Sequence, residues 1–259
     1  MEHTYWHKQS AVEPLFPDLL WSRPENRATA GKLGIIGGNA HGFSAPAEAF
    51  TFASDAGVGT ARVLLPDSLK STVGRVFEAG EYAPSTPSGS LGQKAISEFL
   101  ELSTWSDGIL LAGDFGQNSE TAIVLESFLT KYSGQVTLTG DAVNYFLKHP
   151  QKLLSRPDTL LVLEMSQLQK LAIGSKFPQA FTSIMDLLRT VEVLHNFTKA
   201  FKPSIIVRHQ DTVFVAVDGQ ISTTKSNFVS NQIAPHAAVY YLQNPTKPFE
   251  ALSSSITKY

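Results

Sequence analysis

The sequence predicts a three-layer α/β/α fold around a mostly parallel central sheet. Short apolar runs without polar alternation are typical of strands that are buried on both faces. Amphipathic segments follow most of these runs, and the alternation of strand and helix is typical of a parallel sheet covered by helices on both sides. The predicted strands are 32–38, 61–66, 108–113, 135–140, 159–163 and 204–207.

Polar and glycine residues mark the ends of the first predicted helices. Ser44 is a candidate N-cap for a helix that runs to about residue 55 and stops at Gly57. Asn118 or Ser119 is a candidate N-cap for a second helix that runs to about Tyr132.

The last third of the chain predicts a long helix and a hairpin. Apolar side chains recur at spacings of three and four over 178–201, and Pro203 ends this helix. The segments 212–217 and 220–224 flank Asp218-Gly219, a dipeptide typical of a tight hairpin turn.

Composition excludes several classes of protein. The 259 residues carry 21 Lys and Arg against 23 Asp and Glu, so no excess of cations indicates a nucleic-acid partner. The absence of cysteine excludes disulfides, thiolate metal sites and a cysteine nucleophile. No apolar run is long enough for a membrane span, and we expect a cytoplasmic protein. We expect an N-terminal arm over 1–30 and one domain over 31–259.

Ligands of parallel sheets bind beyond the carboxyl ends of the strands, so the loops there are the candidate sites. The first loop, 37–44, is rich in glycine and precedes a helix, which fits either a phosphate-binding loop or a structural turn. Phe43 stands where a phosphate loop has its lysine. Gly42-Phe43-Ser44-Ala45-Pro46 can also be aligned with a nucleophile elbow, although three residues separate it from its strand.

Two carboxylates follow later strands. Asp114 lies in the loop 112–118, which fits a ligand loop and a plain turn equally well. Asp141 could act in acid–base or metal chemistry, or simply cap the helix that follows. The seven histidines show no paired metal-ligand spacing beyond His3 and His7, so no zinc site is expected.

From about Arg27 to the C-terminus, the order of these elements resembles the ADP- or ATP-dependent NAD(P)H-hydrate dehydratases of the ribokinase-like superfamily. The similar segments are KLGIIGGN, GFSA, APAEAFTFASDAGVG with ARVLLP, DGILLAGDFG, LTGDAVN and FEA. The resemblance implies an ADP or ATP cofactor, with or without Mg²⁺, a small nucleotide or dinucleotide partner, and a homo-oligomer. It implies substrate contacts at Asn39, Ala45, Gly113, Gly116, Asp141 and Glu164, and nucleotide contacts at Arg208, His209 and Asn231.

The departures from this family lie in the loops that carry its chemistry. Val229-Ser230-Asn231-Gln232 stands where the family has Gly-Thr-Gly-Asp, which supplies an anion hole and the catalytic carboxylate. Neither Asn231 nor Gln232 can accept a proton, and losing one preorganised donor typically costs about 10²–10³ in rate. Glu164 replaces a substrate-contacting histidine, and Arg208-His209 replaces Lys-Gly. Asp114 is a new carboxylate that could substitute as the base.

Three hypotheses follow. The first is a ribokinase-like nucleotide-binding protein whose dehydratase activity is weak or lost, leaving ligand binding, regulation or oligomerisation. The second is an active dehydratase that restores hydrated NADH or NADPH with a substitute carboxylate. The third is a hydrolase that acts through Ser44 without a nucleotide.

Overall fold

The computed structural model describes residues 4–24, 26–75, 77–227 and 229–257 and confirms the predicted fold class. Its ten-stranded sheet has the order β1-β10-β9-β8-β7-β6-β5-β2-β3-β4. Neighbouring strands are parallel except on the two sides of β9. The strands are β1 Trp6–Gln9, β2 Lys32–Gly37, β3 Thr60–Pro66, β4 Gly80–Ala83, β5 Gly108–Gly113, β6 Gln135–Leu138, β7 Thr159–Glu164, β8 Ser204–His209, β9 Thr212–Val217 and β10 Gln220–Lys225.

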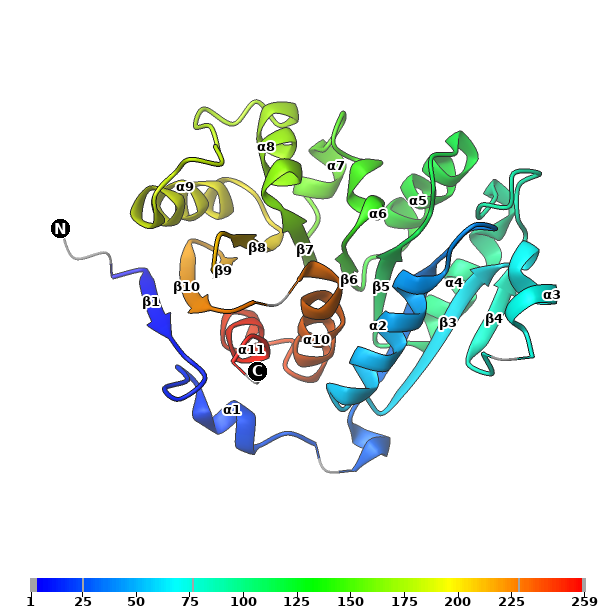
Figure 1. Cartoon of the computed structure of the whole chain (residues 1–259), viewed down its shortest axis with the longest axis horizontal. Coiled ribbons are helices and arrows are strands. Elements are labelled where there is room, and N and C mark those ends of the chain that lie inside the picture. The colour runs from blue at the N-terminus through cyan, green and yellow to red at the C-terminus, as the bar shows by residue number, and fades with distance from the viewer. Residues whose placement is uncertain (1–3, 25, 76, 228, 258–259) are drawn as a thin grey trace.

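Helices cover both faces of the sheet (Figure 1). One face packs mainly against α2, α10 and α11, and the other packs against α4 to α9. The helices are α1 Pro17–Trp21, α2 Ser44–Asp55, α3 Lys70–Val73, α4 Ile96–Trp105, α5 Ser119–Lys131, α6 Asp141–Asn144, α7 Gln151–Leu154, α8 Met165–Gly174, α9 Leu187–Ala200, α10 Ser230–Gln243 and α11 Pro248–Ser255. No helix in the described ranges is long and apolar enough to cross a membrane.

The continuous apolar runs form strands that are buried on both faces, as the sequence predicts. In β2, Ile35 and Ile36 are both fully buried, but they belong to the two different cores. Successive side chains of a strand point to opposite faces, so a strand covered on both faces needs apolar residues at every position.

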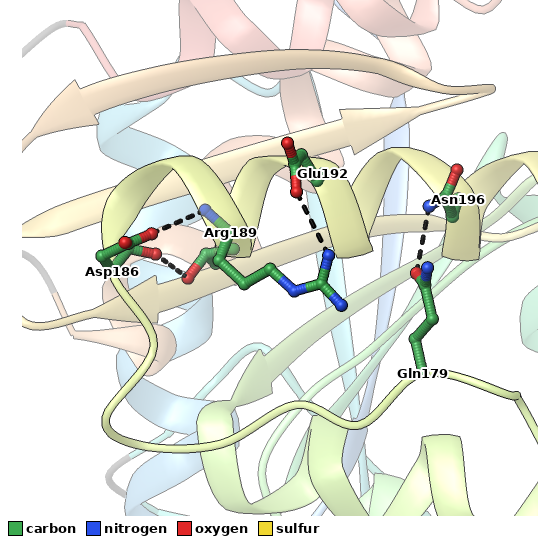
Figure 2. A network of polar contacts seen from close by, with 6 residues as sticks. Gln179, Asp186, Arg189, Glu192 and Asn196 are labelled. Carbon is green, nitrogen blue, oxygen red and sulfur yellow. Dashed lines mark hydrogen bonds and ion pairs between the residues drawn. The ribbon is translucent and has the colours of Figure 1, made fainter.

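The predicted helix over 178–201 is too long at its N-terminal end. The structure begins α9 at Leu187, and the carboxylate of Asp186 accepts a hydrogen bond from the Arg189 amide at 2.7 Å (Figure 2). Phe181 is buried while Ile184 is 90% exposed, so the apolar residues before Asp186 do not share one helical face. The cap stops the helix, and the segment before it buries side chains as a loop.

The N-terminal arm contributes a strand that the sequence analysis did not predict. β1 pairs in parallel with β10, and the indole of Trp6 donates to the Thr223 hydroxyl at 3.0 Å. The amide of Gln9 donates to the Thr224 hydroxyl and to the Ser253 carbonyl. β4 was also not predicted, because its four residues adjoin a Ser- and Pro-rich loop.

Candidate functional site

A cavity of about 360 Å³ lies where β5, β6 and β7 end, between the first turns of α2 and α10. It is lined by Ala45, Ala112, Gly113, Asp114, Thr139, Gly140, Asp141, Glu164, Gln167, Val229, Ser230 and Asn231. Six residues that the sequence analysis selected therefore meet here: Ala45, Gly113, Asp114, Asp141, Glu164 and Asn231. Parallel strands bring their carboxyl ends to one edge, which is why segments far apart in the chain converge.

The carboxylate of Asp141 ties the loop after β5 to the start of α6. It accepts hydrogen bonds from the amides of Phe115 at 3.2 Å and Gly116 at 3.0 Å. Burial raises the pKa of the Asp141 carboxyl, these two amides lower it, and the charge of Asp114 raises it further. Gly140, at φ +58°, is the N-cap of α6, so Asp141 anchors a neighbouring loop and does not cap its own helix.

The carboxylate of Asp114 lies on the N-terminus of α2. Its Oδ2 accepts from the Ala45 amide at 2.8 Å and from the Ser44 hydroxyl at 3.3 Å. Asp114 has φ +58°, a left-handed conformation that aspartate tolerates better than most side chains do. The prediction that Ser44 caps α2 is wrong, because Phe43 is the N-cap and the capping acceptor comes from Asp114.

The third carboxylate, Glu164, links β7, α8 and α10. It caps α8 in a reciprocal capping box with Gln167, and its Oε1 accepts a 2.6 Å hydrogen bond from the Ser230 hydroxyl. The amide of Gln167 reaches across the site and donates to the Gly140 carbonyl at 2.8 Å and to Asn144 Oδ1 at 3.0 Å.

The first turn of α10 forms one wall of the cavity. Val229 is its N-cap, no side chain of the described residues caps its amides, and the turn holds no acidic residue. The side-chain amide of Asn231 points to α2, where it donates to Glu48 Oε2 at 2.8 Å. Gln232 lies one residue further into the helix and does not line the cavity.

Two selected residues support the cavity from outside. Asn39 donates from Nδ2 to the Asp114 carbonyl, and Gly116 lines an adjoining cavity of about 610 Å³ that shares Asp141. Arg208 and His209 do not line the cavity and lie at the end of β8, where Arg208 pairs in the sheet with Glu164 of β7. Arg208 donates to the Gln210 and Asn227 carbonyls, and the buried His209 ring contacts the Met185 carbonyl at 3.1 Å.

Gln167, Thr139 and Glu48 are polar residues in or beside the cavity wall that were not selected from the sequence. The spacing of Glu164 and Gln167 is a capping-box signal that could have identified Gln167. Thr139 and Glu48 carry no such local signal, since their places depend on how β6 and α2 meet α10. Among the described residues, no group of three or more His, Asp or Glu side chains is arranged to hold a metal ion.

Comparisons with known proteins identify the fold. No protein-family model matches the sequence, and no curated protein matches it either. A ribokinase-like superfamily protein from Enterococcus faecalis is similar over 98% of this chain and 87% of its own, with a TM-score of 0.71 and 14% identity. An ADP/ATP-dependent NAD(P)H-hydrate dehydratase from Bacillus subtilis, co-crystallised with ATP and Mg²⁺ and soaked with CoA, is similar over 93% of this chain and 85% of its own, with a TM-score of 0.62 and 13% identity.

A more distant neighbour is the phosphomethylpyrimidine kinase of Clostridium difficile, with a TM-score of 0.52, 11% identity and coverage of 87% of this chain and 96% of its own. At such identities the likeness concerns the fold, and function has to be argued from the site. This chain has the ribokinase-like fold.

Proposed function

We propose that this chain binds a nucleotide or dinucleotide in the cavity between α2 and α10 and has weak or no NAD(P)H-hydrate dehydratase activity. The observation that carries the proposal is the first turn of α10, which faces the cavity without a carboxylate. A proton-abstracting base at this place would need an acidic side chain, and the chain has Asn231 and Gln232 there.

Nucleotide binding is supported by the shape of the site and by its neighbours. A volume of about 360 Å³ lies in the usual range of small-molecule sites. The N-terminus of α10 has no side-chain cap, so its first amides and the helix dipole favour a phosphate group. The Bacillus subtilis dehydratase of similar fold was crystallised with ATP and Mg²⁺. Mg²⁺ usually binds through one or two carboxylates and the phosphates of its ligand, so it would enter this site with the nucleotide.

The alternative of an active dehydratase with a substitute base is favoured by one observation, namely three carboxylates around the cavity. The raised pKa of the Asp141 carboxyl favours it as a base on chemical grounds. However, both of its oxygens accept backbone amides, and Asp114 Oδ2 is engaged by Ala45 and Ser44. The hydroxyl of Ser44 donates to a carboxylate, whereas a hydrolase would need a base such as histidine in that position.

Two measurements test the proposal. ADP or ATP with Mg²⁺ should raise the melting temperature of the wild type, because a ligand that binds only the folded state stabilises it. Ala45→Leu places a larger side chain in the cavity and should abolish this shift. Ala47→Leu, on the same helix but outside the cavity lining, should retain it. Hydrated NADH with ADP or ATP and Mg²⁺ should yield no restored NADH absorbance.

Each measurement has an outcome that overturns its part of the proposal. No melting shift with any nucleotide would contradict nucleotide binding. Turnover of hydrated NADH by the wild type would contradict the loss of activity, and its disappearance in Asp141→Asn or Asp114→Asn would identify the substitute base. Ester hydrolysis that is lost in Ser44→Ala and needs no nucleotide would support a hydrolase.

A further inference from the structure

Three groups of backbone amides around the cavity are occupied by carboxylates of the chain itself. Asp114 accepts from the α2 N-terminus, Asp141 from the loop after β5, and Glu164 from the N-terminus of α8 through its capping box. Amides at helix N-termini and in tight loops are the groups with which proteins bind anions. At this site the chain supplies the anion at each of these three places.

The remaining lining residues do not compensate this negative charge. In the described part of the chain, no Lys, Arg or His lines the cavity. An anionic ligand group that approached α2 would have to displace the Asp114 carboxylate and would still lie close to its charge. In a partly desolvated site this repulsion is stronger than in bulk water.

A buried hydroxyl in the cavity wall is available to a polar ligand. Thr139 lines the cavity and is only 3% exposed, and its Oγ1 has no hydrogen-bond partner among the described residues. A buried hydroxyl without a partner costs free energy that a ligand or a water molecule can recover. Thr139 lies one residue beyond Leu138, which belongs to the opposite core, so its side chain is on the α2 and α10 side of the sheet.

We propose that Asp114 determines the specificity of this cavity by occupying the N-terminus of α2 as a built-in anion. A ligand group that contacts α2 must then be an uncharged or cationic hydrogen-bond donor. The inference rests on the proposed function only in treating the cavity as a ligand site. It adds that any phosphate of the ligand lies away from α2, and it assigns Asp114 to ligand selection instead of proton transfer.

The test compares an anionic and an uncharged probe on the full chain by titration calorimetry at fixed ionic strength. The probes are pyrophosphate and adenosine, and the variants are Asp114→Gly and Asp114→Asn. Both replacements tolerate the positive φ of this position. Gly vacates the α2 N-terminus, whereas Asn removes the charge and leaves a carbonyl oxygen for the Ala45 amide. Asp186→Asn is the matched control, because Asp186 also caps a helix, α9, and does not line the cavity.

Removing the repulsion of one charge should raise the affinity for pyrophosphate at least about tenfold in Asp114→Gly and less in Asp114→Asn. The affinity for adenosine, which carries no charge for Asp114 to repel, should not rise in either variant, and the control should bind both probes as the wild type does. Pyrophosphate binding to Asp114→Gly that is no tighter than to the wild type would overturn the proposal. Adenosine that binds to none of the proteins would instead contradict nucleotide binding, and the pyrophosphate comparison would still decide the role of Asp114.

Discussion

Replacement of Asp141 should destabilise the chain by an amount that depends on how many amides lose their acceptor. The carboxylate holds the amides of Phe115 and Gly116 at 3.2 and 3.0 Å. Two hydrogen bonds to a charged acceptor contribute about 3–6 kcal/mol together. The cost of burying the charge offsets part of this, since burial is the largest influence on the raised pKa of Asp141. We expect Asp141→Ala to lower the free energy of unfolding by about 3 kcal/mol, with both amides left unpaired.

Asp141→Asn retains one acceptor oxygen and should cost about 1.5–2 kcal/mol, because only one amide loses its partner. Equilibrium urea denaturation at neutral pH measures both values. Asp67 offers a matched control: it also receives two hydrogen bonds, from the amide and hydroxyl of Ser85, but it is exposed. Asp67→Ala should cost no more than about 1 kcal/mol, since water replaces the lost contacts. Equal costs at the two positions would refute the reasoning from burial.

The remaining predictions concern pH, close packing and the sheet edge. Burial raises the pKa of Asp141 above its usual 3.8, so just above this pH the folded chain binds more protons than the unfolded chain does. The free energy of unfolding should therefore fall there as pH rises. Urea denaturation at several pH values should show this fall in the wild type and not in Asp141→Asn. Gly59→Ala should cost about 1–3 kcal/mol, because its Cβ would collide with the Arg27 and Gly31 carbonyls, whereas a neutral result would mean that these turns yield. Deletion of 1–9 should expose the edge of β10 and so raise aggregation, measured by light scattering. In the same measurement the intact chain should have the mass of the expected homo-oligomer.

The fold was predictable because its signals are local. The apolar runs at β2, β5 and β7 follow from burial on both faces, and the Asp-Gly turn between β9 and β10 follows from turn geometry. The place of the site followed from a general property of parallel sheets, whose strands all end at one edge. The start of α9 was predicted too early because apolar residues recur at helical spacing through the preceding loop, which buries Phe181. Capping by Asp186 starts the helix at Leu187 instead.

By itself the sequence determined a parallel α/β sheet and the glycine- and carboxylate-bearing loops at the carboxyl ends of its strands. It also showed that the start of α10 has no carboxylate. Only the tertiary structure decided which carboxylate meets which amide, since Asp114 and Ala45 are 69 residues apart in the chain. Local propensity carries no information about such a pair, because the contact forms only when β2 and β5 become neighbours in the sheet. That contact makes Asp114 part of the wall of the cavity, where we propose that it selects the ligand.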